Sequence, residues 1–250
     1  MLGVPFIMRI RSIASESESR LTGIWRLGLC GLALALSPGI WAAADNLSPP
    51  ARPVVWTLEN AASIGGHQPT VLGAPRFIDA GVGPAACFNG KDDGLVVPAI
   101  PIVGWSQFTI EVLFRPDADG PEAQRFVHLQ DERESRVLIE IRVTPEGQWC
   151  LDTFLLSGKN SLPLMDKTKL HPTGSWHWAA LVYDGKKMAH YVDGTKEMEG
   201  EVAFPPMTTG QTSLGVRLNR LYWFKGCIRE VHFSPTALGP AQLQRLPKAN

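Results

Sequence analysis

The chain has 250 residues, of which 44% are hydrophobic, and it contains 24 glycines and 20 prolines. This composition provides material for one sizeable core and many turns, as in all-β sandwiches that run to this length as one domain. Lysine plus arginine equals aspartate plus glutamate at 24 each, so nothing in the charge balance predicts a polyanionic partner such as nucleic acid or an acidic membrane, and we expect neither a nucleic-acid partner nor a membrane span in the mature chain.

Residues 1–44 have the pattern of an export signal peptide. Basic residues precede an apolar run, a helix breaker and a small-residue cleavage site, in the order Arg9, Arg11, Arg20 and Arg26, then 27–36, then Pro38, then Ala42 to Ala44. We expect cleavage after Ala44 and an exported protein that is periplasmic, extracellular or at the cell surface; an uncleaved signal anchor is the alternative. Residues 45–53 carry three prolines and predict an extended linker, and no later segment is apolar enough to span a membrane.

Short runs rich in β-branched and aromatic residues, separated by turn signals, predict ten to twelve strands. In the strongest, residues 108–115, apolar and polar side chains alternate until Pro116 ends the run. In 136–144 the side chains of Val137, Ile139, Ile141 and Val143 are expected to face inward. The expected strands are 54–58, 77–78, 85–89, 95–97, 108–115, 125–130, 136–144, 148–155, 178–183, 187–192, 212–216 and 224–233.

The region between residues 176 and 194 predicts an antiparallel meander, because Asp184-Gly185 and Asp193-Gly194 supply the positive φ angles of tight hairpin turns. Its first strand, 178–183, is apolar at both parities, which predicts burial on both faces. A two-residue turn at Asp184-Gly185 places His177 diagonally near His190. Residues 157–172 are expected to be loop, and Pro240 limits 234–246 to a short turn or helix. These elements together predict an all-β, two-sheet antiparallel jelly-roll sandwich.

Four segments, taken in order, resemble the laminin-G-like domain of the concanavalin A-like lectin/glucanase superfamily, over residues 54–247. They are FNGKDDG at 88–94, FTIE at 108–111, the meander from 176 to 194, and FKGCIREV at 224–231. The resemblance implies a concanavalin A-like sandwich in which the first strands and 224–233 lie close together in one sheet, with a ligand-facing rim or concave face. Three positions depart from the family pattern: His190 is usually apolar, Arg229 is commonly Asp, and Gly94 is commonly aromatic.

Export leaves three cysteines, Cys87, Cys150 and Cys227, so at most one intramolecular disulfide forms. The family topology implies Cys87–Cys227 as the pair. Three buried, reduced cysteines are the alternative, since free cysteine often serves as a small core residue.

The polar turn after residue 88 presents three oxygen donors, Asn89, Asp92 and Asp93, that suit Ca²⁺. Calcium needs six to eight ligands, and Asp-Asp-Gly is already explained by turn chemistry, so the turn alone is the favoured interpretation. No other metal or cofactor is predicted.

Sugar binding requires exposed aromatic rings beside fixed hydrogen-bonding groups, since the apolar faces of pyranose rings stack on aromatic side chains. Trp105, Trp149, Tyr222 and Trp223 are the aromatic candidates, with Arg142 and Asp152 as polar neighbours. Packing in the core or at strand edges is the alternative role for each aromatic residue.

The strand acids Glu111, Glu140 and Asp152 are isolated along the sequence, so no carboxylate pair of a glycosidase is predicted. We therefore expect no catalytic residues and predict an exported, non-catalytic binding module for carbohydrate or a surface protein. A polysaccharide hydrolase or lyase of the same fold, and a purely structural adhesion module, are the alternatives.

Overall fold

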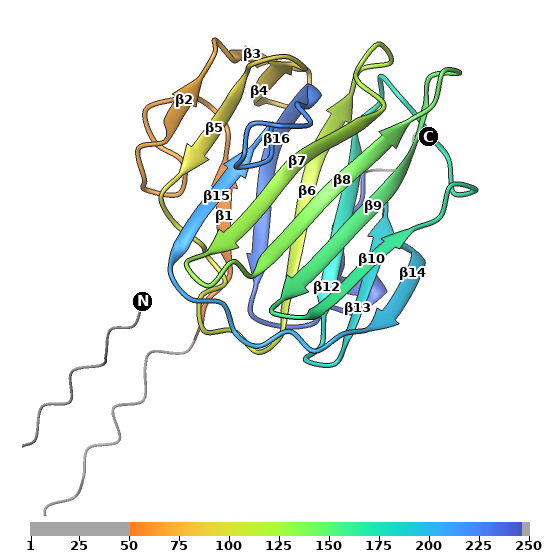
Figure 1. Cartoon of the computed structure of the whole chain (residues 1–250). Helices are drawn as coiled ribbons and strands as arrows, with labels where there is room; N and C mark the ends of the chain where they lie inside the picture. The colour runs from red at the N-terminus through yellow and green to blue at the C-terminus, as the bar shows by residue number, and fades with distance from the viewer. Residues whose placement is uncertain (1–50, 247–250) are drawn as a thin grey trace, which may run out of the picture. The chain divides into compact units, whose positions relative to one another are not determined.

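The computed structural model describes residues 51–246, and the predicted signal peptide and most of the predicted linker lie outside this range. The described residues form an all-β jelly-roll sandwich of two antiparallel sheets and contain no α-helix (Figure 1). The strands are β1 (Val54–Thr57), β2 (Thr70–Leu72), β3 (Arg76–Asp79), β4 (Pro84–Asn89), β5 (Gly94–Val97), β6 (Phe108–Pro116), β7 (Ala123–Asp131), β8 (Arg136–Val143), β9 (Gln148–Ser157), β10 (Asn160–Met165), β11 (His171–Pro172), β12 (His177–Tyr183), β13 (Lys187–Val192), β14 (Thr195–Glu201), β15 (Gly210–Leu214) and β16 (Lys225–Ser234).

Each sheet has eight strands. The sheet nearer the viewer in Figure 1, here called the front sheet, has the order β10-β9-β8-β7-β15-β5-β2, with β11 paired to β9. The back sheet has the order β14-β13-β12-β6-β16-β4-β3, with β1 paired to β16. The family-implied proximity of the first strands to residues 224–233 is therefore confirmed, because β1 and β4 both pair with β16.

Most predicted strands are present within two residues of their expected bounds, but the prediction of loop between 157 and 172 was wrong. That segment contains β10 and β11, which pair with β9 at the edge of the front sheet. Pro163 lies inside β10, and proline is tolerated there because an edge strand leaves some backbone N–H groups unpaired. The three-residue β2 was also not among the expected strands.

The meander of β12, β13 and β14 is confirmed, with one turn as predicted and one longer. Val192 pairs with Thr195, so Asp193 and Gly194 form a two-residue turn with φ angles of 48° and 74°. Tyr183 pairs with Met188, which leaves four residues in the first turn, and the Asp184 carboxylate accepts hydrogen bonds from the backbone of Lys186 and Lys187. This longer turn places His190 opposite Leu181, so the predicted approach of His190 to His177 was wrong.

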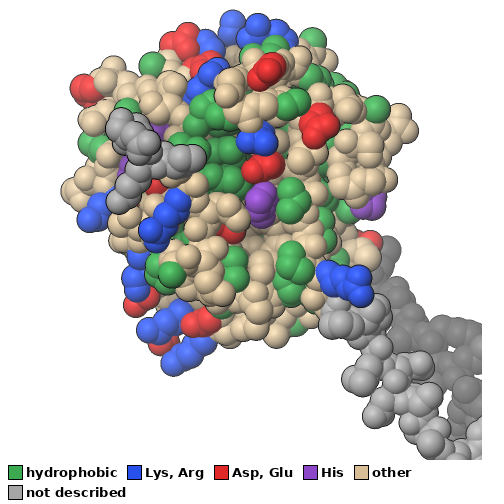
Figure 2. All heavy atoms as spheres, turned by 180° about the vertical axis from the view of Figure 1, so that it is seen from behind, with side chains coloured by type: hydrophobic (Ala, Val, Ile, Leu, Met, Phe, Trp, Pro, Cys, Tyr) green, Lys and Arg blue, Asp and Glu red, His purple; other side chains and the backbone are tan. Residues whose placement is uncertain are grey.

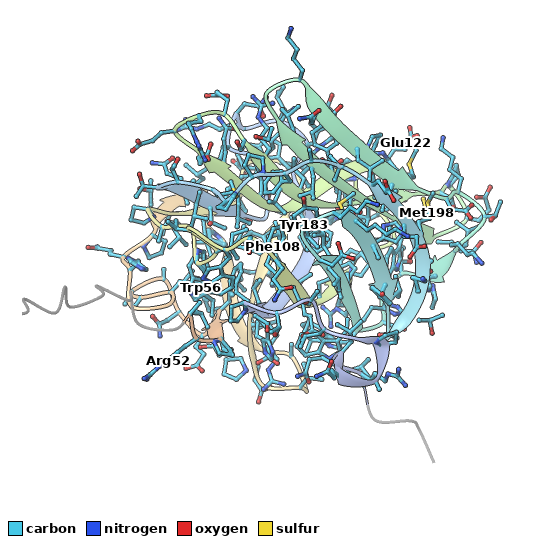
Figure 3. All side chains as sticks on the ribbon, turned by 90° about the horizontal axis from the view of Figure 1, so that it is seen from below. Arg52, Trp56, Phe108, Glu122, Tyr183 and Met198 are labelled. Carbon is cyan, nitrogen blue, oxygen red and sulfur yellow. A yellow bond between two sulfur atoms is a disulfide. The ribbon has the colours of Figure 1, made fainter. Side chains whose placement is uncertain are left out.

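The core lies between the sheets and is rich in aromatic residues. Trp56, Phe108 and Tyr183 lie between the two layers (Figure 3), with ring centroids of Phe108 and Tyr183 5.6 Å apart. The Tyr183 hydroxyl donates to the Val202 carbonyl and accepts from the Phe204 N–H, both at 3.1 Å, so its buried polar atom is satisfied.

The outer face of the back sheet is partly covered by the segment after β16. Leu243 packs there on Ala180, Val182 and Ala189, and Trp178 packs against His232. Every residue of β12 is buried, as its two-sided apolar pattern predicts. The Glu111 carboxylate fixes this segment by accepting a hydrogen bond from the Gln244 N–H at 2.7 Å, and burial raises the pKa of Glu111.

Seen from behind, charged side chains of both signs are scattered around a small hydrophobic area (Figure 2).

Candidate functional site

The outer face of the front sheet is formed by those alternate residues of each strand that point away from the core. In β8, Val137, Ile139, Ile141 and Val143 are buried in the core as expected, which turns Arg136, Leu138, Glu140 and Arg142 to the other side. A bulge in β7 between Arg125 and Val127 shifts the strand by one residue, so Phe126 enters the core while Arg125 lies opposite Glu140.

The register aligns these outward residues in rows across the sheet. Arg125 of β7, Glu140 of β8 and Asp152 of β9 are direct cross-strand neighbours and are called the charged row below. One step further along, Leu138 of β8, Phe154 of β9 and Pro163 of β10 form an apolar row. Cross-strand neighbours on one face have adjacent Cβ atoms, so each row is a continuous surface.

The charged row is held by a network of ion pairs. Arg125 Nε donates to Glu140 Oε1 at 2.9 Å, and Arg142 Nη2 lies 3.2 Å from Glu140 Oε2 and 2.5 Å from Asp152 Oδ2. Burial, followed by the negative charge of Glu140, raises the pKa of Asp152 to about 6. One nitrogen of Arg142 thus bridges the two carboxylates.

A hollow of about 330 Å³ lies over these rows and is called the front hollow. It is bounded by the charged row with Arg142, by the apolar row with Leu156, and by Arg136 and Arg217. Its volume is in the range of small-ligand sites, which combine apolar walls with a few fixed polar groups. A neighbouring hollow of about 460 Å³ shares Arg142 and extends to Glu122, labelled in Figure 3, and to Lys167.

Three buried hydrogen-bonding atoms on this face have no partner among the described residues. They are Arg125 Nη1, Arg136 Nε and His128 Nε2. His128 Nδ1 accepts a hydrogen bond from the Leu218 N–H at 3.0 Å, and the pKa of His128 falls to about 3 because of burial and the nearby charges of Arg217, Arg136 and Arg125. The ring is therefore neutral with its proton on Nε2, and all three atoms are donors that lack an acceptor.

Tyr222 borders the same face from the loop between β15 and β16. The guanidinium carbon of Arg125 lies 3.5 Å from the centroid of the Tyr222 ring, and the Arg125 N–H donates to the Tyr222 carbonyl at 2.9 Å. Tyr222 is 43% exposed and has a φ of 63°, which is uncommon for a residue other than glycine. The loop therefore holds an accessible aromatic ring against one end of the charged row.

The structure brings together only part of the sequence-predicted site. Arg142, Asp152 and Tyr222 lie on one face, whereas Trp223 approaches Gly94 of β5 and Trp105 packs on the core before β6. Trp149 was wrongly predicted as a sugar platform. It points between the sheets with 0% exposure, and its Nε1 donates to the Pro172 carbonyl at 3.1 Å.

The sequence prediction omitted Arg125, Phe154 and Arg217, and it treated Glu140 and Asp152 as isolated acids. They are isolated along the chain but adjacent across β8 and β9. The alternation in β8 of inward aliphatic residues with Arg136, Glu140 and Arg142 was the available signal for a polar outer face.

The predicted calcium ligands are occupied as turn acceptors. Asn89 Oδ1 accepts from the N–H groups of Lys91 and Asp92, and the two Asp93 carboxylate oxygens accept from the N–H groups of Ala74 and Asn89. Asp92 Oδ1 accepts from Asn89 Nδ2 at 2.7 Å. Between residues 51 and 246 there is also no group of three or more His, Cys, Asp or Glu side chains arranged to hold a metal ion. The geometry therefore supports the turn interpretation.

Cys87 and Cys227 form a disulfide between β4 and β16, at paired positions in the back sheet, in agreement with the pairing that the family resemblance implies. Cys150 is a buried free thiol in β9, and burial together with the charge of Asp152 raises its pKa. The alternative of three reduced cysteines does not describe this structure.

The histidines of the meander have separate structural partners. His177 Nδ1 lies 2.9 Å from Asp193 Oδ2, and His190 Nδ1 lies 3.0 Å from the Thr153 hydroxyl of the opposite sheet. Burial lowers the pKa of His190 to about 4, so this ring is neutral near pH 7. His190 therefore provides a polar contact between the sheets at a position that is usually apolar in the resembled family.

The family model Laminin_G_3, described as Concanavalin A-like lectin/glucanases superfamily, matches residues 89–244. The chain belongs to this family. This match confirms the resemblance that the four sequence segments indicated, and the two-sheet structure confirms the concanavalin A-like sandwich that it implied. Among residues 51–246, no helix has the length and apolar character needed to cross a bilayer.

Other solved structures share the jelly-roll fold of this chain. Domain 4 of AbnA, a GH43 extracellular arabinanase from Geobacillus stearothermophilus in complex with arabinotriose, is 22% identical, with a TM-score of 0.52 over 77% of this chain and 96% of that chain. The binding domain of Paraclostridial Mosquitocidal Protein 1 is 12% identical, with a TM-score of 0.56 over 76% of this chain and 50% of that one. The Botulinum neurotoxin serotype G binding domain is 10% identical, with a TM-score of 0.56 over 76% and 49%.

The chain therefore spans about half the length of these two toxin fragments and nearly all of the arabinanase domain. At these identities the likeness concerns the fold. No curated protein sequence matches the chain.

Proposed function

We propose that the protein is an exported, non-catalytic module that binds carbohydrate in the front hollow. The observation that carries this proposal is that an apolar row and a charged row lie side by side in the lining of one hollow. A sugar ring has apolar C–H faces and a rim of hydroxyl groups, so it requires both kinds of surface side by side. Phe154 and Pro163 provide the apolar surface, and Arg125 and Arg142 provide the hydrogen-bond donors.

The fold neighbours add support by analogy. The arabinanase domain is described in complex with arabinotriose, and the toxin fragments are described as binding domains. Fold alone does not determine function, so the proposal depends on the front hollow of this chain.

A binding role is favoured over hydrolysis by the geometry of the two acids. Retaining glycosidases separate their carboxyl groups by about 5 Å and inverting ones by roughly 6.5–9.5 Å, with room for the scissile bond or a water molecule. Here one nitrogen of Arg142 lies 3.2 Å from Glu140 Oε2 and 2.5 Å from Asp152 Oδ2, so a guanidinium group rather than a substrate occupies the space between the two acids. The network holds its charges in place for binding.

Export is supported by the signal pattern of residues 1–44 and by the Cys87–Cys227 disulfide, since disulfides persist in oxidising compartments. We propose a periplasmic, extracellular or cell-surface location. Cell fractionation of the full chain, with N-terminal sequencing of the exported product, tests this. Recovery of the uncut chain in the cytosol would overturn export, and uncut chain in the membrane fraction would favour a signal anchor.

A glycan array tests carbohydrate binding, with reducing-end assays on every retained glycan. We expect retention without release of sugar, and a loss of retention in Phe154→Ala. The matched control is Val55→Ala, which truncates a half-exposed apolar side chain on the back sheet. Release of reducing ends would show an enzyme instead, and retention of no glycan would leave a surface-protein or adhesion role.

A further inference from the structure

We propose that the saccharide bound in the front hollow is anionic, and that Arg125, Arg136 and Arg217 recognise its carboxylate or sulfate group. This inference rests on the proposed carbohydrate-binding function and specifies its ligand class.

The local charge differs from that of the whole chain. The chain as a whole is balanced, with 24 basic and 24 acidic residues. The lining of the front hollow contains four arginines, Arg125, Arg136, Arg142 and Arg217, but only two acids, Glu140 and Asp152, so it carries an excess of two positive charges. Positive charge is therefore concentrated at the place where the surface is hollowed.

The four arginines are not equally engaged. Arg142 is bound to both acids of the charged row, and its charge is compensated. Arg125 Nε pairs with Glu140, while Arg125 Nη1 has no partner. Arg136 Nη2 pairs with Glu134 at 2.8 Å, while Arg136 Nε has no partner. Arg217 has no carboxylate within ion-pair distance among the described residues.

Unpaired buried donors are costly, and here they occur together on one face. A buried polar group without a partner loses its hydration and gains nothing in return. Arg125 Nη1, Arg136 Nε and His128 Nε2 are all donors, and no unpaired buried acceptor accompanies them on this face among the described side chains. Of these, Arg125 and Arg136 line the front hollow. A ligand there that presents several acceptor oxygens satisfies the two arginine donors, and a carboxylate or sulfate presents the most acceptors for its size.

The mutual repulsion of the arginines also favours a negatively charged ligand. The pKa of Arg217 is lowered by burial and then by the charges of Arg136 and Arg125, so the three guanidinium groups act on one another. An anion placed among them relieves that repulsion. Because such a ligand binds the folded chain and not the unfolded chain, it raises the thermal stability of the protein.

The apolar row separates a saccharide acid from a free inorganic anion. Leu138, Phe154 and Pro163 lie beside the arginines and offer no hydrogen bond to a small ion. A sugar acid covers that row with its ring and directs its charged group to the arginines, so it uses both parts of the hollow.

Isothermal titration with matched saccharides tests this inference. One pair is oligogalacturonate and its methyl ester, and the other is a sulfated oligosaccharide and its desulfated form. We expect the anionic member of at least one pair to bind at least tenfold more tightly, an order of magnitude typical of a charge-assisted hydrogen bond. The preferred pair identifies carboxylate or sulfate, and the preference should weaken with added salt.

Arg217→Gln and Arg136→Gln are the informative variants, with Arg52→Gln as the matched control. Arg52, labelled in Figure 3, is exposed, precedes β1 of the back sheet and does not line the front hollow. We expect each hollow variant to lower affinity for the anionic saccharide about tenfold, an order of magnitude appropriate for one charged contact, and so to reduce the ratio of anionic to neutral affinity. Arg52→Gln should change neither.

Equal affinity for the anionic and neutral members of both pairs overturns the inference while leaving carbohydrate binding intact. Failure of the protein to bind any saccharide, acidic or neutral, on the titrations and the glycan array overturns the proposed function itself. Circular dichroism checks the fold of each variant, and if one does not fold, the comparison of matched saccharides on the unmodified protein still decides.

Discussion

Glu140 and Asp152 face each other directly across β8 and β9 on the outer face of the front sheet. Arg142 bridges both acids and Arg125 binds Glu140 from the other side. The two acids position the arginines but also repel each other, so the stability of the folded chain depends on their charge.

Asp152→Asn should remove a destabilisation that develops as the pH rises. The folded pKa of Asp152 is raised to about 6 from an ordinary value of 3.8, so between those values the folded chain binds more protons than the unfolded chain. Its contribution to stability is therefore greatest at low pH and is lost as the pH rises from about 4 to 6.

Urea unfolding at several pH values between 4 and 7 measures this effect. The stability of Asp152→Asn relative to the unmodified protein should increase across the window. Asp117→Asn is the control, since Asp117 makes no side-chain hydrogen bond or ion pair with the described residues. If the unfolding free energies of Asp152→Asn and the unmodified protein changed with pH in parallel, the raised pKa of Asp152 would be contradicted.

The titration of His190 should change stability with pH in the opposite direction to that of Asp152. Its pKa is lowered from 6.5 to about 4, so the unfolded chain takes up the proton first and stability falls as the pH drops through this range. His190→Gln should lower stability at pH 7 by about 1–3 kcal/mol, because it disturbs a buried contact with Thr153. It should also reduce the further loss between pH 6.5 and 4.5. The exposed His67→Gln should do neither.

The sequence predicts those strands whose own side chains alternate or are uniformly apolar. β6, β8 and β12 satisfy that condition, and their core-facing residues are the expected ones. The second face of β6, which its alternation predicts to be exposed, is buried as well. β10 was missed because Asn160, Ser161 and Pro163 oppose strand formation locally, and pairing with β9 outweighs that preference.

The front hollow is harder to predict, because it depends on register. Arg125, Glu140 and Asp152 lie 15 and 12 residues apart along the chain and meet only through the pairing of β7, β8 and β9. A shift of one residue in any of these strands would send its charged side chain into the core. Composition also hides the arginine excess, since acids elsewhere on the surface balance the total.

Trp149→Phe separates packing from ligand contact. The change keeps the aromatic volume near Phe114 and His171 but removes the Nε1 hydrogen bond to the Pro172 carbonyl. We expect a loss of about 1–3 kcal/mol in unfolding free energy, with saccharide affinity unchanged, since the ring does not reach the front hollow. A fall in affinity with unchanged stability would place Trp149 at the binding surface.

Calcium should have no effect on stability, because the donor oxygens of the turn at 89–94 are already hydrogen-bonded. The melting temperature should be the same in EDTA and in added Ca²⁺. Asp93→Ala should lower stability by about 1–3 kcal/mol in both conditions, since it leaves the N–H groups of Ala74 and Asn89 without acceptors. A rise in melting temperature with Ca²⁺ that Asp93→Ala abolishes would establish a metal site.

Reduction should destabilise the protein through one specific bond. The Cys87–Cys227 disulfide joins residues 140 positions apart and closes a long loop in the unfolded chain, so its loss should cost about 2–5 kcal/mol. Thermal unfolding with and without dithiothreitol measures this, and the melting temperature should fall in the reductant. The double variant Cys87→Ala/Cys227→Ala should already unfold at the lower temperature and show no response. Cys150→Ala removes the buried free thiol and should retain the full response to reductant. If Cys150→Ala abolished the response instead, the pairing in solution would differ from the one across β4 and β16.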